Sequence, residues 1–193
     1  MKLKNYIAGQ WIEGSGNEIP LYNAVNGELV AISDTEGIDF ESALHYGRTV
    51  GYKNLSSMTF YDRGEMLKKV ALYLLERKKK YYELSYKTGA THADSWVDIE
   101  GGFGTFFTYS GLAKRMLPNT PFWVDGDTQK ISANGTFLGT HILTPSEGVS
   151  VQINAYNFPV WGMMEKLSTS LLAGVPSIVK PATPGSYLTN AVF

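Results

Sequence analysis

The feature that most constrains this chain is a strand–turn–helix–strand pattern near its C-terminal end. The residues from Gly148 to Ala155 predict a strand, and the turn Asn157-Phe158-Pro159 follows it. A helix is expected from Trp161 to Ala173, and Ser177-Ile178-Val179 predicts a second strand that ends at Lys180. This order indicates two parallel strands joined by a helix, the building unit of an α/β sheet.

Two polar side chains are expected at the same edge of this sheet. Asn157 follows the first strand and Lys180 ends the second, and ligands bind where the carboxyl ends of parallel strands meet. A structural alternative exists for Asn157, because asparagine is a good helix N-cap and this one stands four residues before Trp161. The spacing to Lys180-Pro181 favours ligand binding.

The earlier part of the chain predicts short strands followed by helices. Residues 5–35 contain apolar runs and turns, with a hairpin signal at Asn26-Gly27. Asp62 and Glu65 have capping-box spacing, and Ser95 with Asp98 predicts the start of a helix that runs to about Arg115. The expected core stripe of the first long helix is Met66, Leu67, Val70, Leu74 and Leu75. Residues 122–147 are extended and polar, which indicates a protruding β arm.

Composition excludes several classes of function. The 193 residues carry 17 basic and 18 acidic side chains. The net charge of −1 therefore provides no excess of positive charge that would attract nucleic acid or an anionic membrane. The basic run Arg77–Lys80 is interpreted as a solvated helix face. Without an apolar run near its start or one of membrane-spanning length, the chain is expected to be soluble and cytoplasmic.

Metal and thiol chemistry are not expected within these residues. There is no cysteine, and His45, His92 and His141 lack metal-ligand spacing. The glycines at 101, 102 and 104 fall in a helical stretch, so we expect them to permit close helix packing rather than to bind phosphate. Asp94, Asp98 and Glu100 are expected at capping or helix-end positions.

The motifs resemble those of a known family. Asn157-Phe158-Pro159 followed by Lys180-Pro181, with the opening Tyr6–Trp11 segment and Asn26-Gly27-Glu28, is similar to the aldehyde dehydrogenase superfamily. The stretches Thr88–Thr91, Ala93–Gly102, Ile153–Pro159 and Trp161-Gly162-Met163 resemble one branch in particular. That branch is the aldehyde dehydrogenase half of the bifunctional ring-opening enzyme of bacterial phenylacetate degradation.

The resemblance implies an activity and a set of site residues. The superfamily oxidises an aldehyde through a cysteine thiohemiacetal, passes hydride to NAD or NADP, and releases the acid with a glutamate-activated water. In this branch the substrate is a CoA-linked semialdehyde. Asn157 matches the oxyanion donor, and Lys180 the residue that hydrogen-bonds the adenosine ribose. The expected cofactor contacts are Ile153, Asn154, Ala155, Tyr156, Lys180, Pro181, Ala182 and Thr183.

The resemblance also implies a fold and an assembly. The expected fold is α/β, the N-terminal part of an aldehyde dehydrogenase, with one βαβ unit of an incomplete Rossmann-like sheet, a preceding helical layer and a β arm. Residues 1–121 and 148–193 would form a partial NAD(P)-binding domain, and residues 122–147 an arm that joins subunits into a homo-oligomer.

Two departures from the family pattern matter. Many NAD-using relatives carry a glutamate where this chain has Thr183, and a carboxylate would repel the 2′-phosphate of NADP, so Thr183 favours NADP or mixed use. The family's nucleophilic cysteine, general-base glutamate and glycine-rich helix lie beyond position 193. We therefore expect an N-terminal fragment that is inactive alone.

Two other interpretations stay open at this point. In the first, the chain is a genuine short, non-catalytic subunit that pairs with a full-length chain through its arm. In the second, it is an unrelated nucleotide-binding module. An open two-stranded sheet predicts exposed apolar surface under each of them.

Overall fold

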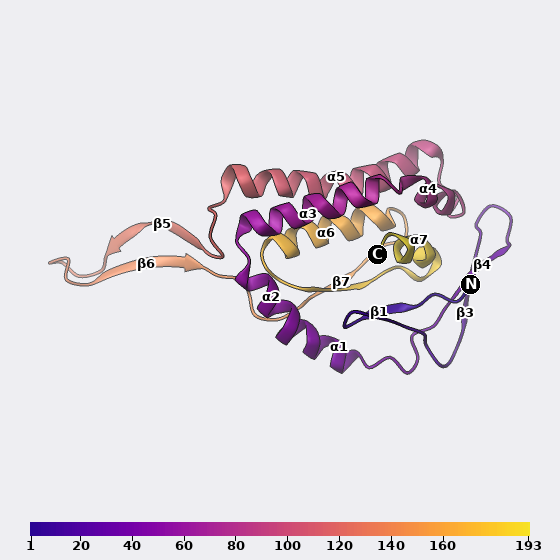
Figure 1. Ribbon diagram of the computed structural model, residues 1–193, viewed down its shortest axis with the longest axis horizontal. Helices are drawn as coiled ribbons and strands as arrows, with labels where there is room; N and C mark the ends of the chain where they lie inside the picture. The colour runs from indigo at the N-terminus through magenta and orange to yellow at the C-terminus, as the bar shows by residue number, and fades with distance from the viewer.

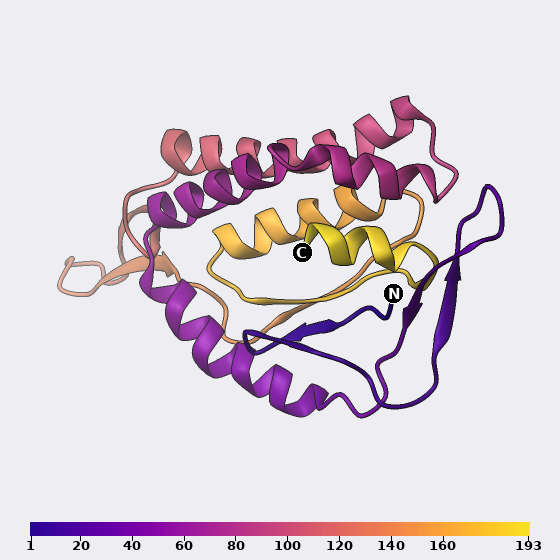
Figure 2. The same cartoon turned by 45° about the vertical axis from the view of Figure 1, so that its right-hand side comes forward.

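The fold is a layered α/β arrangement with a hairpin that projects from one end (Figure 1). It was obtained as a computed structural model and describes residues 1–193. Two long antiparallel helices form the outer layer, a third helix lies beneath them, and a small parallel sheet lies beneath that helix (Figure 2). The expected fold class is confirmed, because each predicted layer is present.

The central unit is the predicted strand–helix–strand segment. Strand β7 (Ser150–Ile153) pairs in parallel with β8 (Ser177–Lys180), and helix α6 (Pro159–Leu172) connects them. Met163, Met164 and Leu172 of α6 are buried in the main core. The sheet has only these two strands, as predicted.

The outer helical layer consists of α3 (Phe60–Leu75), α4 (Lys78–Tyr86) and α5 (His92–Met116). The predicted capping boxes, Asp62 with Glu65 and Ser95 with Asp98, are wrong, because both helices begin about one turn earlier. The pairs that cap are Thr59 with Asp62 at the start of α3 and Thr91 with Asp94 at the start of α5. In both, the threonine hydroxyl and the aspartate at the third helical position exchange hydrogen bonds with backbone N–H groups.

The buried stripe of α3 differs in part from the predicted one. Leu67 and Leu74 are buried as expected, but Val70 is exposed and Ala71 is buried in its place. The stripe is shifted because α3 packs chiefly on α5: Gly64, where a Cβ would lie 2.7 Å from that of Ala113, marks the contact face, and Ala71 lies two turns later on the same face. The core also includes Tyr81, Ile99, Phe103, Phe106, Val160, Tyr187 and Leu188.

The N-terminal segment forms two hairpins and a helical stretch. Strands β1 (Asn5–Ile7) and β2 (Gln10–Ile12) pair around a turn at Ala8 and Gly9, both with positive φ, so residues 5–12 form a hairpin rather than one strand. Strands β3 (Ile19–Tyr22) and β4 (Leu29–Ser33) form the hairpin signalled by Asn26-Gly27. Helix α1 (Phe40–Tyr46), the π-helical turn η1 (Gly47–Gly51) and α2 (Tyr52–Ser57) then lead to α3.

The predicted β arm is a two-stranded antiparallel hairpin. Strand β5 (Trp123–Lys130) pairs with β6 (Leu138–Leu143), and all eight residues of β5 are exposed. The hairpin extends away from the helical layers (Figure 1). The arm is confirmed as a structural element; its role in joining subunits stays a prediction.

The chain ends in a helical segment that the sequence pattern did not predict. A 3₁₀ turn, η2 (Thr183–Gly185), leads into α7 (Ser186–Val192), whose Tyr187, Leu188 and Val192 are buried. None of the helices combines the length and the apolar character that a membrane crossing requires.

Candidate functional site

The ends of β7 and β8 lie side by side, as the sequence predicted. Ile153 is in register with Lys180, and the backbone N–H of Asn154 donates to the Lys180 carbonyl at 3.0 Å. The turn that begins at Ala155 and carries Asn157 therefore starts at the sheet edge where Lys180 ends β8. This is the arrangement in which an α/β sheet presents residues to a ligand.

Asn157 is exposed, and its side chain makes no hydrogen bond within the chain. The alternative role as a helix cap is not observed, because Phe158 occupies the N-cap position of α6 and no side chain of the turn caps the helix. The Asn157 amide is thus free to donate a hydrogen bond to a ligand.

The free backbone N–H groups at the start of α6 are instead bonded to Asp98, which lies on α5. One carboxylate oxygen, Oδ1, accepts hydrogen bonds from the backbone N–H groups of Val160 at 3.0 Å and Trp161 at 2.8 Å. Asp98 is only 4% exposed, and this burial raises its pKa to about 6 while the two N–H donors oppose the rise. Asp98 therefore caps a helix, but a spatial neighbour rather than its own. The expected helix-end position is wrong for Asp98 and for Glu100, because both lie within α5, where Glu100 accepts from Lys78 and Tyr82 instead.

Replacing Asp98 by asparagine is expected to change how stability depends on pH. A carboxyl group with a raised folded-state pKa stabilises the fold below its unfolded pKa, and this contribution is lost as the pH rises through the folded value. With values of 3.8 and about 6, the unfolding free energy of the wild type should fall by about 2–3 kcal/mol relative to Asp98→Asn between about pH 4 and pH 7. Urea unfolding across this range measures the change. Parallel curves for the two proteins would contradict it.

The side chain of Asn154 is held by helix α6. It is buried, and the Lys166 ammonium donates to its Oδ1 at 2.9 Å and to the Gly162 carbonyl at 2.8 Å. The Asn154 side chain is therefore engaged with α6, and what it can offer to a ligand is its backbone. Its neighbours Ile153 and Tyr156 are more than 70% exposed, so the edge itself is open.

The second strand end presents a cation and a hydroxyl. Lys180 is exposed and forms no ion pair, and the half-buried Thr183 uses its backbone carbonyl, not its hydroxyl, to accept from Ser186 at 2.9 Å. Pro181 and Ala182 connect the two in an extended segment that enters η2. A free ammonium and a free hydroxyl three residues apart fit the ribose and phosphate groups of a dinucleotide.

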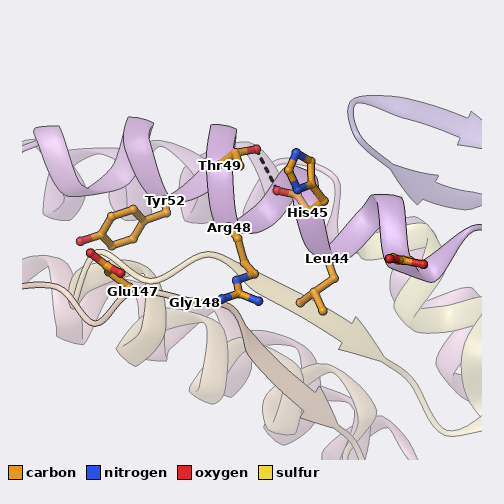
Figure 3. Close-up of a pocket in the computed structure, with 8 residues that line it drawn as sticks. Leu44, His45, Arg48, Thr49, Tyr52, Glu147 and Gly148 are labelled. Carbon is orange, nitrogen blue, oxygen red and sulfur yellow. Dashed lines mark hydrogen bonds between the residues drawn. The ribbon is translucent and has the colours of Figure 1, made fainter.

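A cleft lies elsewhere on the molecule. It has a volume of about 530 Å³ and is bounded by the α1–α2 stretch and by Glu147 and Gly148, ahead of β7. Figure 3 shows His45, Arg48 and Tyr52 along it, with the Thr49 hydroxyl bonded to the His45 carbonyl at 2.8 Å. None of its lining residues belongs to the strand-end site, and no three histidine, cysteine or acidic side chains of the chain converge to hold a metal.

Sequence reasoning did not connect two residues with the site. Lys166 falls on the polar face of α6 and carries no local signal. Asp98 was expected only to cap a helix, although Gly101 and Gly102 follow it at helical spacing and mark a face where another backbone approaches closely.

Comparison with known proteins identifies aldehyde dehydrogenases as relatives of this chain. A model of the aldehyde dehydrogenase family matches residues 11–193. The 3,4-dehydroadipyl-CoA semialdehyde dehydrogenase of Aromatoleum evansii is 38% identical over 191 residues, which cover 98% of this chain and 37% of that protein. Its name agrees with the CoA-linked semialdehyde branch that the motifs resemble.

Solved structures give the same result for the fold. The 3,6-anhydro-L-galactose dehydrogenase in complex with NAP superposes with a TM-score of 0.85 at 25% identity, over 100% of this chain and 39% of that one. A betaine aldehyde dehydrogenase point mutant from Staphylococcus aureus in complex with NAD+ has a TM-score of 0.80 at 24% identity, covering 99% and 37%. The chain thus spans well under half the length of these relatives and matches the N-terminal part of their fold.

Proposed function

The chain belongs to the aldehyde dehydrogenase family, and on that premise we propose that it forms the N-terminal part of an NAD(P)-dependent enzyme that oxidises a CoA-linked semialdehyde to the acid. The observation that carries the proposal is that an unbonded Asn157, in the turn after β7, and an unpaired Lys180, at the end of β8, belong to the same edge of the sheet. The similarity to the Aromatoleum protein supports the substrate class.

Each site residue has a proposed task. Asn157 donates its amide N–H to the aldehyde oxygen as that oxygen becomes negative, which is worth most in a site without water. Lys180 and Thr183 hold the ribose and its phosphate, and the backbone from Ile153 to Tyr156 lines the nucleotide. Pro181 and Ala182 place the two side chains. The bound nicotinamide supplies the hydride acceptor.

The proposal requires residues outside this chain. The 193 residues contain no cysteine, so they hold no thiol nucleophile. The outer side of β7 is also uncovered, with Val151 and Ile153 at 62% and 73% exposed. Apolar strand positions of that kind are normally buried, and further elements packed on that face of the sheet would cover them.

Reading the natural coding sequence past codon 193 tests this proposal, together with an assay of the purified product. We expect a cysteine and a glutamate in the family's sequence context, and reduction of NADP or NAD when a CoA-linked semialdehyde is supplied. A longer protein without that cysteine, or one that reduces neither cofactor with any aldehyde, would contradict the proposal.

Replacing Thr183 by glutamate is expected to move cofactor preference from NADP towards NAD. A carboxylate beside the ribose would repel the 2′-phosphate, and we expect the Kd for NADP to rise at least about tenfold, equal to about 1.4 kcal/mol. The Kd for NAD should change less than about threefold. Fluorescence titration of the complete protein measures both, and Thr183→Gln controls for side-chain size without charge. A wild-type protein that binds NAD more tightly than NADP would refute the assignment.

The β arm supports a second candidate, a chain that acts by association. Every residue of β5 is exposed, and each arm strand has one edge without a partner. Such an edge can accept a strand from another subunit. Under this alternative a short form co-purifies with a longer aldehyde dehydrogenase subunit, and intact mass measurement of the native complex separates the two candidates.

A further inference from the structure

The first turn of α6 is anchored by another helix. Pro159 stands at the first helical position and has no N–H, and the N-cap residue Phe158 offers no side-chain acceptor. The first two free N–H groups, on Val160 and Trp161, both donate to Asp98. A buried carboxylate 62 residues earlier therefore does the work that a residue at 157 or 158 would ordinarily do.

Two glycines bring α5 close enough for this contact. A Cβ on Gly102 would lie 3.1 Å from the Trp161 backbone N and Cα, and one on Gly101 would lie 3.0 Å from the Trp161 ring. Asp98, Gly101 and Gly102 share one face of α5 because they are spaced by three and four residues. Together they form a socket for the first turn of α6.

We propose that Asp98 is a positioning residue for Asn157. By holding the N–H groups of Val160 and Trp161, it fixes the end of the turn that carries the Asn157 amide, three residues before Val160. It also leaves the Asn157 side chain free, since the helix start needs no cap from the turn. The inference rests on the proposed function, because the place of this amide matters for rate only if it serves the reacting oxygen.

The cofactor side of the site is held independently of Asp98. Lys180 lies on β8, which is fixed by its pairing with β7, and Asn154 is bonded to both Lys180 and Lys166. Loss of the anchor should therefore shift the amide and leave the nucleotide contacts in place. A displacement of about 1 Å in a reacting group can cost about 100-fold in rate.

The test compares Asp98→Leu with Asp98→Asn in the complete protein that contains this chain. Leucine removes the acceptor at similar size, whereas asparagine retains an acceptor oxygen. We expect Asp98→Leu to lower kcat about 100-fold with the Kd for NADP or NAD within about threefold, and Asp98→Asn to recover most of the loss. Amide hydrogen exchange of a peptide spanning residues 155–166 should be faster in Asp98→Leu and close to wild type in Asp98→Asn.

The controls separate positioning from general loss of stability. Asp94→Leu makes the same substitution one turn earlier on α5, where the carboxylate is exposed and caps only its own helix. It should lower stability without changing exchange at 155–166. If Asp98→Leu does not accumulate, Asp98→Ser replaces it, since the shorter hydroxyl cannot reach both N–H groups.

The outcomes distinguish two failures. Unchanged exchange in Asp98→Leu, or faster exchange with an unchanged kcat, would overturn the positioning role. A wild-type protein without dehydrogenase activity would instead refute the proposed function, and the exchange comparison would still decide whether Asp98 anchors the turn.

Discussion

Replacing Asn157 by alanine is expected to lower kcat of the complete enzyme by about 100- to 1,000-fold, or about 3–4 kcal/mol of transition-state stabilisation. The amide N–H is proposed to bond an oxygen that becomes negative only during reaction, so its loss should appear in kcat rather than in KM. Steady-state kinetics with saturating cofactor measure this. A loss of less than about threefold would show that Asn157 is not the oxyanion donor.

The structure predicts that this loss is not caused by misfolding. Asn157 is exposed, forms no side-chain hydrogen bond and does not cap α6. Its replacement should change the unfolding free energy by less than about 0.5 kcal/mol. Asn119, an exposed loop asparagine without a side-chain hydrogen bond, offers a matched control, and Asn119→Ala should retain wild-type kcat. Asn157→Asp keeps the shape but has no N–H to donate, so it should be at least as impaired as the alanine variant.

Much of this site could be predicted because its signals are local. The segment from Ser150 to Lys180 carries an apolar strand, a proline-marked helix start and a second apolar strand in succession, and each is found within about two residues of its expected place. The Asn26-Gly27 hairpin and the β arm follow from turn residues for the same reason. Short-range patterns were therefore sufficient to place Asn157 and Lys180 at one sheet edge.

The features that could not be predicted from the sequence depend on contacts between distant residues or on residue types that are uncommon in the local structure they adopt. Both capping boxes pair threonine with aspartate, and a second pair of similar spacing follows about one turn later in each helix, so the start of each helix was predicted too late. The turn at Ala8 was hidden because alanine rarely takes positive φ. The role of Asp98 depends on the packing of α6 against α5, because its hydrogen-bond partners lie 62 and 63 residues away in the sequence.

Replacing Gly174 by alanine is expected to destabilise the fold by about 2–4 kcal/mol. Gly174 ends α6 with a φ of +83°, in the left-handed region where a side chain costs about 1 kcal/mol. It is also buried, and a Cβ there would lie 2.5 Å from Nη1 of Arg63 and 2.9 Å from Cγ of Pro145. These neighbours cannot move away easily, because Arg63 is itself fully buried and its Nη1 donates to the Leu55 carbonyl at 3.1 Å.

Gly27 provides the matched control for this prediction. It has a similar φ of +75°, but nothing lies within 4 Å of a Cβ built on it. Gly27→Ala should therefore cost about 1 kcal/mol, the backbone strain alone, and the difference between the two variants measures the steric contribution at Gly174. Denaturant unfolding of both proteins gives this difference. Equal losses would mean that Arg63 and Pro145 yield to the added methyl group, and the connection between α6 and β8 would then be looser than the contacts around Gly174 indicate.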